Sequence, residues 1–166
     1  MKRRYKIDTV LKTMSRLREI IPNVQFTTDL MVGFPGETEE DFEKTLEFAK
    51  SARLLDAHVF CFSKREGTEA YGFDGQIEKS IKEERSNRLS SLIKEIKKEI
   101  LSELILEKKE MTALVETREN GYFTAHSPSY IELKIIDDGE CDLRGKTVKV
   151  IPVSQKDGIL ECIKSK

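Results

Sequence analysis

The 166-residue sequence contains no tryptophan, little cysteine and no long apolar segment. Its three cysteines, Cys61, Cys141 and Cys162, are scattered and form no C-x-x-C pair, which argues against a disulfide framework or a zinc site. Each is expected to be a small buried apolar residue. No apolar run approaches the roughly 18 residues of a membrane span, and no signal-peptide pattern is present. We therefore expect a soluble, cytoplasmic protein without a membrane partner.

The composition is low in apolar residues and high in charge. Hydrophobic residues make up 38% and charged residues 36% of the chain, against about 45–50% and about 25% in typical globular domains. This balance is typical of long charged helix faces, or of a chain that carries part of a larger core. The net charge of −1 gives no sign of a nucleic-acid partner by itself.

Helices and parallel strands are predicted to alternate in the first part of the chain. A helical apolar pattern from Asp8, the expected N-cap, is stopped by Pro22. Thr38, with Asp41 three residues later, predicts the start of another helix. The expected elements are a helix over 8–21, a strand over 24–34, a helix from 38, a strand over 57–63 and a long helix over 77–106. This order indicates right-handed βα units. Since two parallel strands need neighbours, the segment is expected to be a piece of a larger barrel or sheet.

The pattern changes after Lys109 to short β-prone runs separated by turn residues. The predicted strands are 111–117, 122–126, 130–136, 147–153 and 158–163. Five short strands joined by tight turns predict a small closed β-barrel. The fold class is thus α/β followed by all-β, with domains at 1–106 and 107–166.

The turn after the first strand has two interpretations. Asp29 is expected at the strand end, and Gly33 and Gly36 allow a tight turn and a close backbone approach to a ligand. The N–H groups of the next helix start could hold an anion. The alternative is an ordinary, well-capped βα turn.

Three segments resemble one known family in order and spacing. The stretch TTDLMVGFPGETEEDFEKTLEF, residues 27–48, resembles the barrel segment of the radical-SAM methylthiotransferases. MKRRY, residues 1–5, is similar to the M-x-R-x-Y element of that family, and FSKREGTEAY, residues 62–71, to its Y-S-x-R-x-G-T-x-A motif, with Phe62 in place of Tyr. The resemblance implies the C-terminal part of a radical-SAM β/α barrel, joined by a long helix to an OB-like TRAM domain.

The resemblance also implies roles for residues of the first part. Arg3 would pair with the methionyl carboxylate of S-adenosylmethionine, because a guanidinium forks onto a carboxylate. Asp29 would accept a hydrogen bond from the cofactor or substrate at the C-terminal rim of the barrel, with Gly33 beside it. Arg65 and Thr68 are implied on the substrate side. The alternative is that Arg3 is a terminal charge and Asp29 a strand-end cap.

The all-β part is implied to bind tRNA. GYFTAHSPSYIELKI, residues 121–135, is similar to the pattern of the branch that modifies threonylcarbamoyladenosine beside the anticodon. Aromatic and hydroxyl side chains on a small barrel suit base stacking and phosphate contacts. The candidate RNA-binding residues are Tyr122, His126, Tyr130, Lys134 and Lys146, with further cations at Arg144 and Lys149. Alternatively, about half of the rings fill the barrel interior, and strand alternation places Phe123 and Ala125 opposite Tyr122 and Thr124.

One departure from the family concerns its metal clusters. The family holds one [4Fe–4S] cluster on C-x-x-x-C-x-x-C and a second on three cysteines of an N-terminal domain, and this chain has neither set. Both clusters and S-adenosylmethionine are therefore expected of a complete enzyme with N-terminal cluster-binding domains, and this chain alone is expected to be catalytically silent. The function implied is methylthiolation of C2 of N6-threonylcarbamoyladenosine 37 through contacts with the anticodon stem-loop. The isopentenyladenosine branch, the ribosomal-protein branch and a stand-alone RNA-binding fragment remain alternatives.

Overall fold

The computed structural model describes residues 5–21, 23–119, 121–137, 139 and 141–165. The chain divides into two compact units, residues 1–96 and 97–166. The division lies inside helix α3 (Lys79–Leu106), ten residues before the boundary expected at residue 106.

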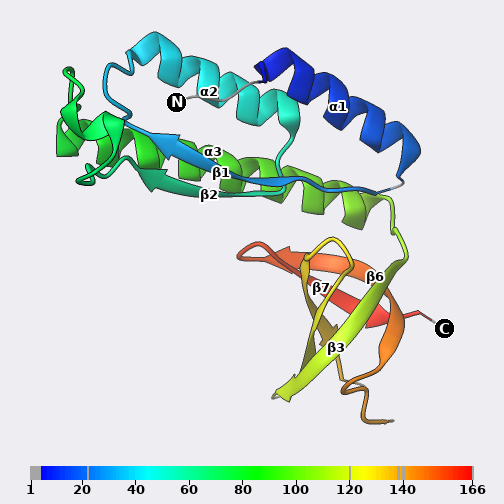
Figure 1. Cartoon of the computed structure of the whole chain (residues 1–166). Coiled ribbons are helices and arrows are strands. Elements are labelled where there is room, and N and C mark those ends of the chain that lie inside the picture. Colours follow the sequence, from blue (N-terminus) through cyan, green and yellow to red (C-terminus); the bar gives the residue numbers. More distant parts are fainter. Residues whose placement is uncertain (1–4, 22, 120, 138, 140, 166) are drawn as a thin grey trace. The chain divides into compact units, whose positions relative to one another are not determined.

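The first unit is α/β, as expected. Its two strands, β1 (Thr27–Val32) and β2 (Asp56–Cys61), are parallel and in register from Thr27–Asp56 to Val32–Cys61. Helices α1 (Ile7–Ile20) and α2 (Glu39–Ala52) lie on one side of the strands (Figure 1). A short 3₁₀ helix, η1 (Glu69–Gly72), precedes α3. The buried side chains of this unit include Val32, Phe42, Ala49, Leu54 and Leu89.

One of the two predicted helix N-caps is present in the structure. Thr38 is the N-cap of α2, and its hydroxyl and Asp41 form the predicted reciprocal capping box. Asp8, by contrast, does not cap α1. That helix begins at Ile7 after Lys6, and Asp8 lies in the first turn, where its charge still suits the helix dipole.

Arg85 of α3 is a buried charged residue of the α/β unit. Arg85 is 5% exposed, and its Nη1 atom lies 2.6 Å from Oε1 of Glu37. The same Glu37 oxygen accepts the Gly33 N–H at 3.0 Å, and Arg85 Nη2 lies 3.1 Å from Oε2 of Glu39. A charge so deeply buried is stable only when paired in this way. Arg85 therefore joins α3 to the turn after β1 and to the start of α2.

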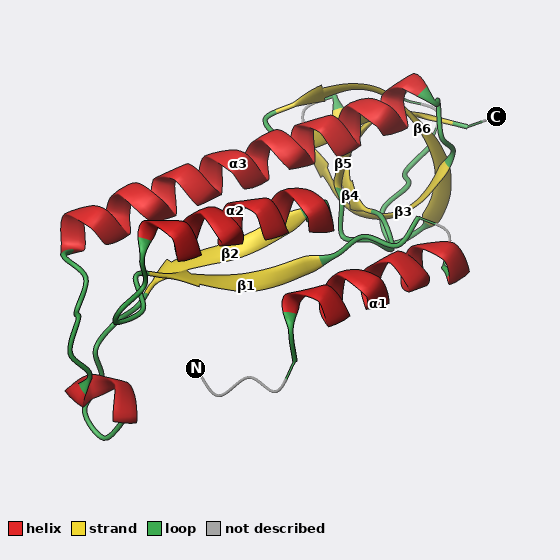
Figure 2. Cartoon of the chain, turned by 90° about the horizontal axis from the view of Figure 1, so that it is seen from above, coloured by secondary structure: helices red, strands yellow, loops and turns green. Residues whose placement is uncertain are grey.

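The second unit contains the expected closed barrel of five strands. These are β3 (Met111–Glu119), β4 (Tyr122–His126), β5 (Glu132–Ile136), β6 (Thr147–Lys156) and β7 (Ile159–Lys164), in the order β3-β4-β5-β7-β6. Figure 2 shows the strands as a ring. Among the described strands of this barrel, β5 and β7 pair in parallel and the other neighbours are antiparallel. The interior is apolar and includes Phe123, Leu133, Ile135, Val150, Leu160 and Cys162.

Loss of the Arg85 guanidinium should destabilise the α/β unit strongly. Arg85→Met leaves the half-enclosed Glu37 carboxylate without its partner, which costs about 3–5 kcal/mol in comparable buried pairs. Urea unfolding followed by the helical circular-dichroism signal measures the change. Arg88→Met is the matched control, because Arg88 pairs with Glu39, Glu43 and Glu84 at the surface, where ion pairs contribute little. Equal losses for the two variants would contradict this role of Arg85.

Candidate functional site

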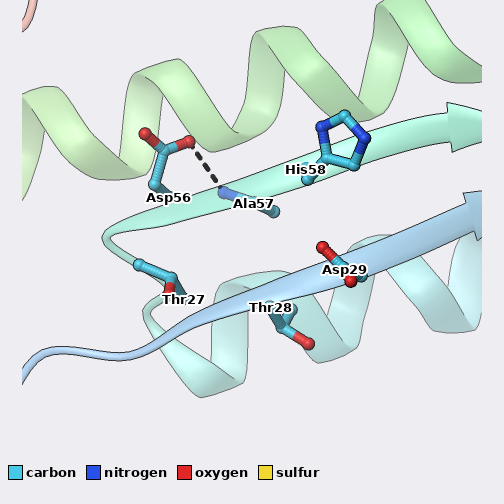
Figure 3. Close-up of a pocket in the computed structure, with 6 residues that line it drawn as sticks. All are labelled: Thr27, Thr28, Asp29, Asp56, Ala57 and His58. Atoms are coloured by element: carbon cyan, nitrogen blue, oxygen red, sulfur yellow. Dashed lines mark hydrogen bonds between the residues drawn. The ribbon is translucent and has the colours of Figure 1, made fainter.

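The open face of the two parallel strands carries Asp29 and His58. The two residues are register partners on neighbouring strands, and both are exposed. Figure 3 shows them with Thr27 and Asp56 along a shallow pocket, where the Ala57 N–H donates to Asp56 at 2.8 Å. Asp29 is the third of six residues in β1, so its expected position at the strand end is wrong. A carboxylate and an imidazole side by side offer an acceptor and a proton-exchanging group to a polar ligand.

Gly33 follows the carboxyl end of β1 with a φ of +71°. A Cβ atom there would lie 2.4 Å from Cγ of Lys82 on α3, so the missing side chain makes room for that lysine. Lys82 also donates from Nζ to the carbonyl of Phe62 at 3.2 Å, just after β2. The close approach at Gly33 is therefore an approach to α3, and the ends of both strands are tied to that helix.

Arg65 and Thr68 lie in the exposed segment after β2. The Thr68 hydroxyl donates to the Arg65 carbonyl at 2.7 Å, and both side chains face solvent. β1 and β2 are parallel, so their carboxyl ends lie at the same end of the sheet. The segment with Arg65 and Thr68 therefore leaves the sheet at the same end as Gly33. Arg3, the expected partner of the cofactor carboxylate, lies outside the described residues.

Sequence reasoning missed an aromatic cluster at this edge. The Phe34 ring contacts the Phe62 ring with centroids 5.3 Å apart and the Phe73 ring with centroids 6.2 Å apart. Phe73 is 44% exposed. The signal available in the sequence was that Phe34 lies two residues after β1 and Phe62 directly after β2.

On the barrel, three candidate RNA-binding residues share one outer face. Tyr122 and His126 alternate outward along β4, and Lys134 of β5 is the register partner of Thr124 between them. Phe123 and Ala125 are buried, as the alternation predicted. Lys134 Nζ lies 4.7 Å from the Tyr122 ring centroid. The Tyr122 hydroxyl donates to Glu119, and this bond raises the pKa of Tyr122.

Tyr130 is held outward by a tight turn. The prediction that it begins a strand is wrong, since β5 starts at Glu132. Its N–H donates to the Ser127 carbonyl at 2.9 Å, and the Ile131 N–H donates to the buried Ser127 hydroxyl at 3.1 Å. Tyr130 is 85% exposed with a φ of +58°, and no ring contact among the described residues involves it. A bulky residue in this backbone region is strained, and such strain is concentrated at functional sites.

His126 and Tyr130 border the same groove. It is lined by Thr112, Leu114, Glu116, His126, Ser127, Pro128, Tyr130 and Thr147. Leu114, 50% exposed, is the register partner of both His126 and Thr147. Nδ1 of His126 lies 3.1 Å from Oε2 of Glu116 without the alignment of a hydrogen bond.

Some cationic side chains of the barrel are paired with carboxylates, and others have no such partner among the described residues. Arg144 is hydrogen-bonded to Asp142 and lowers the pKa of that carboxyl to about 2, and Lys149 lies 3.6 Å from Glu110. Among the described residues, no ion pair includes Lys134 or Lys146. Lys146 is exposed beside Thr147 at the groove. These two lysines are the cations best placed to contact a phosphate.

The cysteines do not form a cluster site. Cys61 donates to the Lys82 carbonyl, Cys141 is exposed, and Cys162 lies in the barrel core, where burial raises the pKa of its thiol to about 12. Within the described ranges, no three His, Cys, Asp or Glu side chains are grouped to hold a metal ion. These donors do not fit a cysteine-ligated iron–sulfur cluster. The helices of the described part also include none long and apolar enough to cross a membrane.

Comparison with known proteins identifies the class and then the family. The profile of the Radical SAM superfamily matches residues 1–49. The chain is 36% identical over 153 residues to the threonylcarbamoyladenosine tRNA methylthiotransferase MtaB of Bacillus subtilis, covering 90% of this chain and 34% of that protein. It is 45% identical over 100 residues to a tRNA-2-methylthio-N(6)-dimethylallyladenosine synthase of Alkaliphilus oremlandii, covering 60% of this chain and 21% of that protein.

These matches place the chain in the radical SAM superfamily. Within it, the chain belongs to the radical-SAM tRNA methylthiotransferase family. It spans between about a fifth and a third of the length of the curated relatives that it matches.

Anaerobic treatment of the purified chain with iron and sulfide should give no stoichiometric absorbance near about 400 nm, because Cys61 and Cys162 lie in different strands and Cys141 lies in the loop between β5 and β6. The absorbance spectrum and the iron content per chain measure the outcome. A stable four-iron centre on this chain would contradict the conclusion that its cysteines do not form a cluster site.

Proposed function

We propose that the chain is the C-terminal part of a tRNA methylthiotransferase that modifies C2 of N6-threonylcarbamoyladenosine 37. In this proposal residues 1–106 supply the rim of the S-adenosylmethionine and substrate site. Residues 107–166 form a TRAM domain that holds the anticodon stem-loop. The cytoplasmic location and the N-terminal cluster-binding domains belong to the same proposal.

The residues on the outer face of β4 and β5 are the main support for the proposed RNA binding. A five-stranded barrel of the OB type binds oligonucleotides on the face of its second and third strands, which are β4 and β5 here. That face presents Tyr122, His126 and Lys134, and the turn between the two strands presents Tyr130. Single-stranded RNA is held by such aromatic platforms beside cations.

The length of the matches supports the threonylcarbamoyladenosine branch. The alignment with the Bacillus subtilis protein covers 90% of the chain, whereas the one with the Alkaliphilus oremlandii synthase covers 60% at higher identity. The segment 121–135 also carries the pattern of the threonylcarbamoyladenosine branch. The dimethylallyladenosine and ribosomal-protein branches are the alternatives, and comparison of the modified nucleoside formed by the complete enzyme separates them.

The strand ends of residues 1–106 support the role proposed for this part. Gly33, Arg65 and Thr68 follow the carboxyl ends of parallel strands, where β/α barrels collect their active sites. When bound in the complete enzyme, S-adenosylmethionine and the clusters would supply the radical chemistry. Asp29 and His58 would offer polar contacts on the adjacent open face, and Arg3 is proposed for the cofactor carboxylate. The cysteines of this chain provide no ligands for that chemistry.

A stand-alone RNA-binding fragment is the second candidate function, favoured by the same barrel face. Both candidates predict that the isolated chain binds an anticodon stem-loop. The two candidates predict different DNA upstream of Met1. An in-frame C-x-x-x-C-x-x-C sequence there supports the enzyme.

Replacement of Tyr130 by alanine should weaken binding of the anticodon stem-loop by about tenfold, since one stacked base contributes about 1–3 kcal/mol. Tyr122→Ala should have a smaller effect, because Lys134 already covers its ring. Fluorescence anisotropy with a labelled stem-loop measures the affinities.

Glu132→Gln is the matched control on the same face and should change the affinity little. Circular dichroism establishes that each variant keeps the barrel. Unchanged affinity in both tyrosine variants would place the RNA contact elsewhere on the chain.

A further inference from the structure

The groove beside Tyr130 contains an acid that RNA binding alone does not explain. Glu116 lies at an irregularity in the register of β3, because Val115 pairs with Ala125 and Thr117 already pairs with Thr124. Such a bulge leaves one residue unpaired and re-aims its side chain, often beside a functional site. Here the carboxylate of Glu116 lines the groove next to His126. A negative charge on a surface for phosphate backbones is unfavourable unless it has another partner.

The neighbouring imidazole lacks a hydrogen bond. Nδ1 of His126 is buried, and among the described residues it has no hydrogen-bonding partner, although Oε2 of Glu116 lies 3.1 Å away. A nitrogen without accessible surface cannot contact a ligand, whereas the Glu116 side chain is 47% exposed and its carboxylate can accept hydrogen bonds from a ligand in the groove.

Apolar and aromatic residues of the groove lining are suited to contact a flat ring. The half-exposed Leu114 lines the groove together with Pro128 and Tyr130. Within the part of the chain that the structure describes, Tyr130 has no ring partner, and the Ser127 turn fixes its backbone. An unpaired nucleobase gains by stacking on such a ring.

The polar groups select the edge of that base. An ionised carboxylate accepts through two oxygens and donates nothing. The Watson–Crick edge of guanine presents two adjacent donors, N2–H and N1–H, which match the two oxygens of Glu116. The Watson–Crick edges of adenine, cytosine and uracil do not present two adjacent N–H donors.

We propose that this groove binds one unpaired guanine, stacked against Tyr130 and recognised by the carboxylate of Glu116, beside which His126 lies. The proposal rests on the RNA-binding function proposed above and adds a base preference to it. Glu116 is then a specificity-determining residue, and Lys146 beside the groove contacts a flanking phosphate.

Binding of the full chain to the RNA pentamers UUGUU, UUAUU, UUIUU and UUUUU tests this, with anisotropy as the readout. UUGUU should bind about tenfold more tightly than UUAUU or UUUUU, because of its charge-assisted hydrogen bonds. UUIUU, whose inosine lacks the N2 amino group, should lie between them. Equal affinities for the four pentamers would overturn the guanine site.

Glu116→Gln should abolish the preference to within about twofold without weakening UUUUU binding, since charged acceptors make the stronger hydrogen bonds. Glu132→Gln, the same change at the register partner of His126, should leave the preference intact. Tyr130→Ala should weaken all four pentamers alike. A guanine preference that survives in Glu116→Gln would overturn the role of Glu116. Anticodon stem-loop binding without any base preference would overturn the guanine site and leave the proposed tRNA contact standing.

Discussion

The Arg85 guanidinium connects the parts of the α/β unit that two strands alone cannot hold. A parallel pair has free edges and needs helices to cover it. Arg85 reaches Glu37 in the turn after β1 and Glu39 at the start of α2, while Lys82, one turn earlier on α3, reaches the end of β2. The position of the strand ends, and hence of Gly33 and the segment with Arg65 and Thr68, therefore depends on two cations of one helix.

Features set by local interactions were predictable from the sequence. The Thr38–Asp41 capping box involves residues three apart, and the five barrel strands are marked by turn residues between β-prone runs. The position of Asp29 was not, because the bounds of a parallel strand depend on its partner. β1 pairs with β2 from Thr27 to Val32, so three strand residues follow Asp29.

The barrel face was partly predictable for the same reason. Alternation along β4 correctly separated Tyr122 from Phe123. Tyr130 was placed in a strand because its β-propensity outweighed a turn that depends on the buried Ser127 hydroxyl. Glu116 gave no signal among thirty acidic residues. Its orientation arises from a register shift between β3 and β4, which requires the paired strands to be seen together.

The contact between Gly33 and Lys82 restricts which substitutions are tolerated at these two positions. An alanine at position 33 would be strained at a φ of +71° and would also meet the Lys82 side chain. Shortening position 82 would relieve the second problem but remove the hydrogen bond to Phe62. Substitution at either position alone is thus unfavourable, and homologous sequences should change the two sites jointly or not at all.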